Sequence, residues 1–454
     1  MGSYVPSTLD ERQVMLEELG LSSTDDLYAV VPEEARAGEL DLPEGRSELE
    51  VSAEMQDLAA KNTVFKSVFR GAGAYKHYIP AIVKTVTSKE EFVTAYTPYQ
   101  AEISQGVLQS IFEYQTQVCE LFGMDASNAS VYDGATAAAE AVLMCEDRHR
   151  TGVLVAGTVD PQVQTVVKTY CGSRGVDVTV LDSADHAVDL GSLEERLAAA
   201  PVASVLVQSP NYYGIIEDMD AIVAAAHGAK AKVVMSANPI SLGLLKTPGE
   251  YGADIAVAEG QPLGLPLSYG GPYLGIMCCK KAMMRKLPGR IVGQTVDSEG
   301  NRCYVLTLQA REQHIRREKA SSNICSNEAL CAMTASVYLA AMGPKGIRQA
   351  AVSSSSNAHY LAGELGKIEG FELCSSRPFF HEFLMTCPVD AEELCDALAE
   401  RGILGGLPVE GGILWCCTEL NRKAQIDELV AAVKEFVEGA GVGCPSCSAK
   451  EAHA

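Results

Sequence analysis

Hydroxyl and amide side chains are concentrated in one short stretch, TAYTPYQAEISQG, at residues 94–106. Its proline fixes the local backbone and biases the preceding residue toward an extended conformation, which predicts a rigid loop before a helix. Such a loop could present Tyr96, Thr97, Tyr99 and Gln100 to a small polar ligand. On composition alone, a helix cap with aromatic packing beneath it is the favoured interpretation.

A second stretch, NASVYDGATAAAE at residues 128–140, is a glycine-containing turn that leads into an alanine-rich helix. The free amides and the dipole at a helix N-terminus can bind phosphate. Asp133 stands in this turn and would repel a phosphate, but an aspartate in this position can cap the helix. Capping is the slightly favoured interpretation, and phosphate binding is the alternative.

A third stretch, REQHIRREKASSNIC at residues 311–325, joins a predicted basic helix to a polar turn. Ser321, Ser322 and Asn323 could donate hydrogen bonds to a phosphate or a carboxylate. The alternative is a solvated helix followed by a cap for the helix that begins near Glu328. A single histidine, His314, is more often structural than catalytic.

The elements that would position these stretches follow an α/β pattern. Residues 101–121 have the three-four apolar spacing of a long amphipathic helix. After it, short apolar runs alternate with helix-like segments, which predicts a mostly parallel sheet covered by helices. The runs lie at residues 153–157, 178–181, 204–210, 232–237 and 254–260, and the helix-like segments at residues 162–170, 192–200 and 219–227. Ligands of such sheets bind at the carboxyl ends of the strands.

The same pattern predicts four parts of the chain. They are an N-terminal helical segment (residues 1–70), a large α/β domain (71–318), a small C-terminal α+β domain (319–440) and a flexible tail (441–454). Within the small domain, residues 383–387 and 413–418 resemble strands, and residues 391–401 and 422–437 resemble helices. A long helix is expected over residues 327–341.

The stretch EGQPLGLP at residues 259–266 follows the last predicted parallel strand. Enzymes of this architecture that use pyridoxal phosphate (PLP) place a lysine there, because its amine forms the imine with the cofactor. The matching position holds Gln261 or Pro262, depending on which flank sets the count, and neither residue can form an imine. Met235 or Ser236 stands where an acidic partner of the pyridine nitrogen is expected.

The charge and the cysteines narrow the function class and the compartment. A formal net charge of −23 disfavours binding to nucleic acid or to an anionic membrane surface. The 15 cysteines show no disulfide-framework spacing, which indicates a reducing compartment. With no visible secretory signal, the cytoplasm is expected. Cys444 and Cys447 form a CxxC pair, which is weak evidence for zinc, and no metal site is predicted.

Several long motifs in the same order resemble the glycine decarboxylase P-protein family of the glycine cleavage system, and in particular the first subunit of its two-subunit form. The motifs are TAYTPYQAEISQG, NASVYDGATAAAEA, PISLGLLKTPGEYGADI, YGGPYLG and REQHIRREKASSNIC. The resemblance runs from about the first dozen residues to about residue 440. It does not extend to the cysteine-containing tail.

The resemblance implies the PLP-dependent transferase fold of type I and a glycine dehydrogenase (decarboxylating) that is active only with its partner. The lysine-bearing second subunit would hold PLP covalently in a heterodimer or heterotetramer. Glycine would be decarboxylated there, and the aminomethyl group would pass to the lipoyl arm of the H-protein. In this chain, Tyr96, Thr97, Tyr99 and Gln100 would shape the glycine and lipoyl side of the partner's site.

Across the same interface, Ser321, Ser322 and Asn323 would contact the cofactor phosphate, and this chain's own cavity would bind no PLP. The alternative function is a non-catalytic scaffold or regulatory subunit of the same complex. A self-sufficient PLP enzyme is disfavoured because the loop lacks its lysine.

Overall fold

The computed structural model describes residues 7–38 and 41–440 of the chain. It divides into two compact units, with the boundary between Thr63 and Val64. The first unit contains helices α1 (Leu9–Glu18) and α2 (Glu48–Ala59) and two 3-10 turns, η1 (Thr24–Tyr28) and η2 (Glu33–Ala35). Thr8 caps α1, and Ser47 caps α2 in the same way.

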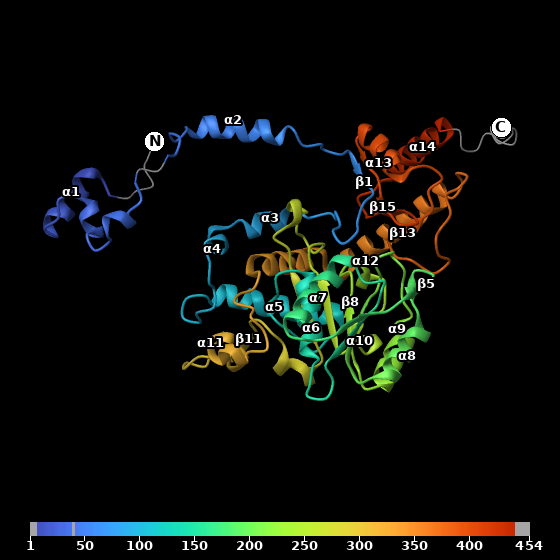
Figure 1. Cartoon of the computed structure of the whole chain (residues 1–454), viewed down its shortest axis with the longest axis horizontal. Helices are drawn as coiled ribbons and strands as arrows, with labels where there is room; N and C mark the ends of the chain where they lie inside the picture. Colours follow the sequence, from blue (N-terminus) through green and yellow to red (C-terminus); the bar gives the residue numbers. More distant parts are fainter. Residues whose placement is uncertain (1–6, 39–40, 441–454) are drawn as a thin grey trace. The chain divides into compact units, whose positions relative to one another are not determined.

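A seven-stranded sheet forms the centre of the second unit (Figure 1), in the order β2-β10-β9-β8-β7-β3-β4. The strands are β2 (Ala126–Ser127), β3 (Gly152–Val155), β4 (Val178–Val180), β7 (Val202–Gln208), β8 (Lys232–Ser236), β9 (Ile255–Glu259) and β10 (Gly275–Cys279). The five strands from β9 to β4 in this order are parallel to their neighbours, and β10 is antiparallel to both β9 and β2. Each of the five predicted apolar runs coincides with one of these five parallel strands, which confirms the predicted mostly parallel sheet.

Helices follow the strands as the sequence predicts. They are α5 (Gln105–Phe122), α6 (Gly134–Met144), α7 (Pro161–Ser173), α8 (Leu190–Ala199), α9 (Met219–Gly228) and the short α10 (Pro248–Tyr251). Short helices α3 (Ala81–Thr87) and α4 (Glu90–Val93) precede α5. Every side chain of α6 from Ala137 to Met144 is buried, because this alanine-rich helix packs against both the sheet and α7.

The C-terminal part has its own core and its own three-stranded antiparallel sheet. The sheet is formed by β13 (Glu382–Met385), β16 (Gly412–Cys416) and β15 (Leu407–Val409), and it packs with α13 (Ala391–Glu400) and α14 (Lys423–Gly439). Strand β1 (Ser67–Val68) pairs in parallel with β14 (Ile403–Leu404), so residues 67–68 join this part of the fold. The predicted small α+β domain is therefore present, while its exact limits stay predictions.

Helix α12 (Ala329–Leu365) connects the two cores. Its residues Cys331–Ala351 contribute to the core of the large sheet, and its residues Ala358–Leu365 contribute to the core around Trp415. The helix is kinked at Gly343, which has a φ of 60° and is followed by Pro344. The sequence predicts a helix end near residue 341, and the structure has the kink there instead.

One predicted helix is wrong. Residues 311–319 form only a four-residue helix, α11 (Gln313–Arg316), between the 3-10 turns η6 (Gln309–Arg311) and η7 (Arg317–Lys319). Tertiary hydrogen bonds explain the difference, because the Arg311 guanidinium donates to the carbonyls of Leu287 and Gly289. Near it lies the β-hairpin of β11 (Val292–Val296) and β12 (Arg302–Leu306).

Across the described ranges, no helix combines the length and the apolar character that crossing a membrane requires. Cys444, Cys447 and the tail predicted at residues 441–454 lie outside the described residues.

Candidate active-site cavity and the loops beside it

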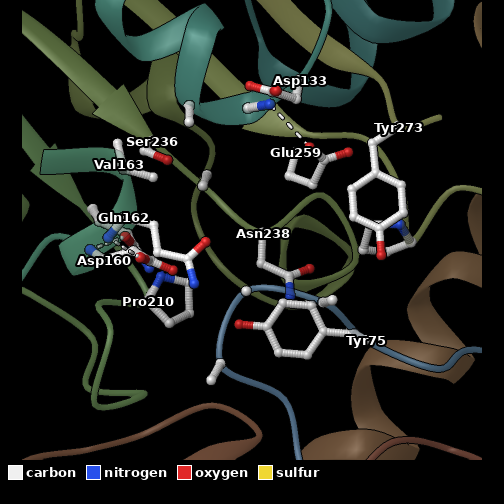
Figure 2. Close-up of a pocket in the computed structure, with 18 of the residues that line it drawn as sticks. Tyr75, Asp133, Asp160, Gln162, Val163, Pro210, Ser236, Asn238, Glu259 and Tyr273 are labelled. Atoms are coloured by element: carbon white, nitrogen blue, oxygen red, sulfur yellow. Dashed lines mark hydrogen bonds between the residues drawn. The ribbon is translucent and has the colours of Figure 1, made fainter. Parts of the chain in front are cut away.

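A cavity of about 480 Å³ opens at the carboxyl ends of the parallel strands (Figure 2). Gln208 of β7, Ser236 of β8 and Glu259 of β9 line it, as does the N-terminus of α6. This is the place where parallel α/β sheets bind their ligands. Residues 72–75 and 381–382 complete the wall, so segments from both ends of the chain meet at this cavity.

Gln261, one of the two candidates for the place expected for the lysine, has both ends of its amide hydrogen-bonded within the chain. Only 1 % of the residue is exposed. Its Oε1 accepts from the Tyr75 amide at 2.9 Å, and its Nε2 donates to the carbonyls of Tyr75 at 3.0 Å and Leu265 at 2.8 Å. Gln261 therefore clamps the segment around Tyr75 to the loop after β9. Pro262, the other candidate for this place, lines the cavity.

The Glu259 carboxyl accepts hydrogen bonds from the backbone amides that a bound anion would need as donors. Its Oε2 accepts from the Gly134 amide at 2.9 Å, at the first residue of α6. Its Oε1 accepts from the amides of Gln261 at 2.8 Å and Leu274 at 3.1 Å. A Cβ at Gly134 would lie 2.7 Å from the Glu259 backbone nitrogen, so only glycine allows this approach. Burial raises the pKa of Glu259 to about 7, although the three amide donors act in the opposite direction.

The open question about Asp133 is resolved in favour of capping. Its Oδ1 accepts from the Thr136 amide at 2.8 Å, and the Thr136 hydroxyl accepts from the Asp133 amide at 3.1 Å. Two of the free amides at the start of α6, those of Gly134 and Thr136, therefore bind carboxylates of the chain itself.

A second buried carboxyl, that of Glu382, lines the same cavity. Glu382 accepts from the Ala72 amide at 2.6 Å and from the Tyr75 hydroxyl at 2.5 Å, and burial raises its pKa to about 7. Next to it, burial and the neighbouring His77 hold the pKa of His381 well below its usual value, so this imidazole is neutral at pH 7.

These residues do not fit PLP. The lining contains four carboxyl groups, those of Asp133, Asp160, Glu259 and Glu382, and neither a lysine nor an arginine among the residues that the structure describes there. A phosphate dianion would meet repulsion rather than compensating charge. At the end of β8, Ser236 lines the cavity while Met235 is buried, so no carboxylate stands at this place for the pyridine nitrogen.

Two of the polar stretches identified in the sequence lie side by side. The Tyr99 hydroxyl hydrogen-bonds to Ser326 Oγ at 2.9 Å and donates to Asn327 Oδ1. The Arg290 guanidinium lies 5.2 Å from the centre of the Tyr99 ring, forms an ion pair with Glu312, and donates to the Cys325 carbonyl at 3.2 Å. Arg290 thus links residues 94–104 to residues 309–327.

The predicted site residues in these loops differ in their exposure. Tyr96 is 93 % exposed, and Thr97 and Gln100 are also exposed, whereas Tyr99 is half-buried by the contacts above. In the other loop, Ser321 and Asn323 are exposed.

Ser322 differs from its two neighbours because it is buried. Its hydroxyl donates to the Glu140 carboxyl at 2.9 Å, so this hydroxyl is engaged within the chain. The Ser321 carbonyl accepts from Arg174 at 2.7 Å. The proposed roles of both loops at a partner's site stay predictions.

Several residues of these sites were not found from the sequence. Glu259 lies in a stretch that the sequence singles out, but nothing in the stretch shows that it would bond to α6. Glu382 and Tyr75 lie about three hundred residues apart in the chain, and Arg290 lies outside all the polar stretches. Of these residues, Glu259 alone had a signal in the sequence, which is its carboxyl group beside a glycine-rich turn.

Known proteins resemble the chain over nearly its whole length. A family model described as "Glycine cleavage system P-protein" matches residues 2–433. A protein of Desulfitobacterium hafniense named "Probable glycine dehydrogenase (decarboxylating) subunit 1" is 48% identical over 445 residues, which cover 96% of this chain and 100% of the relative. A protein of Moorella thermoacetica with the same name is 48% identical over 441 residues, covering 95% and 99% of the two chains.

Solved structures agree with this likeness. A crystal structure of glycine decarboxylase (P-protein) of the glycine cleavage system, in inhibitor-bound form, superposes with a TM-score of 0.91 at 45% identity and covers 96% of this chain and 100% of that chain. An alanine–glyoxylate aminotransferase from Nostoc superposes with a TM-score of 0.58 at 16% identity, over 92% of this chain and 100% of its own, and shares the fold alone. The expected type I fold is thereby confirmed.

Proposed function

Because the chain belongs to the family of glycine cleavage system P-proteins, we propose that it acts as subunit 1 of a glycine dehydrogenase (decarboxylating). It is an enzyme subunit that works only together with a second, lysine-bearing subunit. In this assembly, glycine loses its carboxyl group and the remaining aminomethyl group passes to the lipoyl arm of the H-protein.

The observation that carries the proposal is the double replacement in this chain's own cavity. Gln261 and Pro262, the two candidates for the place of the lysine, cannot form an imine, and Glu259 accepts from the Gly134 amide at the start of α6. Neither replacement is compatible with a covalently bound, phosphorylated cofactor. PLP is therefore assigned to the partner subunit, where it supplies the electron sink for decarboxylation.

This chain would then contribute to the partner's site from outside. The exposed side chains of Tyr96, Thr97 and Gln100 lie on a loop that Tyr99 fixes to the rest of the chain. They are available to shape the side from which glycine and the lipoyl arm enter. Ser321 and Asn323 are also exposed, in the loop whose Ser326 and Asn327 hydrogen-bond to Tyr99, and they could donate hydrogen bonds to the cofactor phosphate across the interface.

The role of Ser322 in this arrangement is more restricted. Its hydroxyl proton is committed to Glu140, so a contact with phosphate would use its backbone amide or require the Glu140 bond to break. We therefore assign the trans phosphate contact mainly to Ser321 and Asn323 and keep Ser322 as the residue that fixes the turn. The absence of disulfide-framework spacing among the cysteines supports a cytoplasmic assembly.

Reconstitution with the partner tests the proposal. We expect glycine–bicarbonate exchange from the mixture of the two subunits with H-protein, and no exchange from this chain alone. Exchange by this chain alone would contradict the assignment of the lysine to the partner.

A substitution at Tyr99 distinguishes a subunit that contributes to the partner's active site from a non-catalytic scaffold. Tyr99→Phe removes the hydrogen bonds to Ser326 and Asn327, and we expect a slower exchange in the assembled enzyme with unchanged assembly. Tyr360→Phe is the matched control, because it also removes two hydrogen bonds of a tyrosine hydroxyl, with Asp427 and Lys423, on the C-terminal part. Equal exchange rates for both variants and the unchanged protein would instead support the scaffold.

A further inference from the structure

A second, smaller cavity of about 200 Å³ lies between β1 and the start of α14. Figure 1 shows β1 beside the C-terminal helices. The segment of residues 66–76 separates the two cavities, because Ala72–Tyr75 line the large acidic cavity while Lys66, Arg70 and Lys76 line the small one.

The residues that line this small cavity are positively charged, whereas the chain as a whole has a net negative charge. The chain carries 59 acidic and 36 basic side chains, yet the cavity lining contains three basic residues and no acidic one. Within residues 7–38 and 41–440, none of these three takes part in an ion pair. A group of cations with no acidic residue beside it attracts anions.

The local sequence explains why the cations converge. In the extended backbone of β1, alternate side chains point to opposite sides. Phe69 is buried in the C-terminal core, whereas Lys66, Val68 and Arg70 line the cavity together with the buried Ser67.

The polar side chains of the lining donate hydrogen bonds to backbone carbonyls of residues 66–76 and not to the charged groups of the basic residues. Asn421 donates to the Val68 carbonyl at 2.8 Å, Gln425 to the Lys66 carbonyl at 3.2 Å, and Thr418 to the Lys76 carbonyl at 2.8 Å. The positions of the basic residues are thus fixed by side chains that precede or begin α14. In the described part of the chain, the ammonium groups of Lys66 and Lys76 have no hydrogen-bond partner.

Arg70 adds a cation that is partly removed from water. Its guanidinium is half-buried and donates to the carbonyls of Gly405 and Gly406, with the shortest bond at 2.7 Å to Gly406. Carbonyl groups satisfy its hydrogen bonds but do not neutralise its charge. The 17-residue helix α14 begins at the same cavity and adds the positive end of its dipole.

We propose that this cavity binds a phosphate group, either as inorganic phosphate or as a small phosphate monoester. A phosphate carries close to two negative charges and several acceptor oxygens, which matches the three cations that residues 66–76 place at the cavity. Lysine ammonium groups bind phosphate as point charges and need no planar partner. A single carboxylate would leave two of the three cations uncompensated. The proposal does not depend on the function proposed above.

Calorimetric titration of the full-length chain in a phosphate-free buffer tests the proposal. Inorganic phosphate, glycerol 3-phosphate and succinate are titrated separately, which distinguishes the free ion from the monoester and from a dicarboxylate. We expect binding of at least one phosphate compound, weaker at higher salt. The Lys66→Gln/Lys76→Gln variant should bind at least about tenfold more weakly, because each tenfold corresponds to 1.4 kcal/mol and two of three charges are lost.

The matched control is Lys168→Gln/Lys345→Gln, which removes the same charge from two exposed lysines elsewhere. It should retain the affinity of the unchanged chain within about twofold, since screening weakens distant surface charges. The melting temperature of both variants without phosphate should match that of the unchanged chain, because all four lysines are exposed. Phosphate should raise the melting temperature of the unchanged chain and the control more than that of Lys66→Gln/Lys76→Gln.

Three results would overturn the proposal. The first is no measurable heat with either phosphate compound. The second is equal loss of affinity in the two double variants, which would show a general charge effect. The third is succinate binding as tightly as the phosphate compounds, which would show that the cavity does not select phosphate.

Discussion

Replacing Gln261 by lysine tests whether the missing amine alone keeps PLP out of this chain. Gln261→Lys removes the acceptor for the buried Tyr75 amide and replaces an amide that makes three hydrogen bonds. An orphaned buried amide costs about 1–3 kcal/mol, and each lost bond contributes about 1 kcal/mol. We therefore expect the free energy of unfolding to fall by about 3 kcal/mol, measured by urea denaturation.

The more informative expectation concerns the cofactor. In Gln261→Lys, Glu259 still occupies the Gly134 amide, and the four carboxyl groups of the lining still repel a phosphate. We expect no stoichiometric imine after incubation with PLP, assayed by absorbance and by borohydride reduction followed by peptide mapping. Gln261→Lys/Glu259→Ser should take up more PLP than the single variant, because it frees the amides of Gly134, Gln261 and Leu274.

The control for this experiment is Gln162→Lys, which places the same amine at the exposed rim of the same cavity. It reports adventitious reaction of any nearby lysine with PLP. If Gln261→Lys alone were labelled stoichiometrically at residue 261 while Gln162→Lys was not, the proposed exclusion by Glu259 would be refuted.

Three further predictions follow from the same contacts. The pKa of Glu382 is higher in the folded chain, about 7, than its ordinary 4.5. The contribution of Glu382 to the unfolding free energy should therefore be greatest below about pH 4.5 and be lost, by about 3 kcal/mol, as the pH rises past 7. Glu382→Gln should remove this contribution from a urea-denaturation pH profile. Arg290→Met should leave the Glu312 carboxylate without its guanidinium partner and lower the unfolding free energy by about 3 kcal/mol. It should also speed proteolysis within residues 94–104 and 309–327. Unchanged cleavage in these segments would contradict the linking role of Arg290. Phe383→Ala should lower the unfolding free energy by about 3–5 kcal/mol, followed through the fluorescence of its cross-strand neighbour Trp415, the only tryptophan of the chain.

The parallel sheet was predictable because its strands are short continuous apolar runs separated by helical patterns. Runs such as residues 232–237 and 254–260 are buried on both faces, so their sequence carries the signal without any tertiary information. The helix expected over residues 311–319 was not predictable in this way. Its short form depends on Arg311 bonding to carbonyls of residues 287 and 289, which lie outside any window of local sequence.

The candidate sites also combine features that local sequence predicts with features that depend on distant residues. The loss of the lysine could be deduced from the sequence, because the position is defined by a strand and a glycine-rich loop that follow each other directly. The functions of Gln261 and Glu259 could not, because each depends on a distant partner. Gln261 bonds to Tyr75, 186 positions away, and Glu259 bonds to Gly134, 125 positions away.

Gln261 and Glu259 have structural roles in this chain, because each accepts a hydrogen bond from a backbone amide. A lysine at position 261 could not accept the Tyr75 amide, and an empty anion site at α6 would leave the Gly134 amide unpaired. By contrast, a glutamine and a carboxylate satisfy these groups from within the chain and hold residues 72–75 against the sheet. The same segment continues to Lys76 and, before it, to Arg70 and Lys66 of the small cationic cavity. The Gln261 contacts at Tyr75 and the bonds from Thr418, Asn421 and Gln425 therefore hold one continuous segment, which forms part of the wall of both cavities.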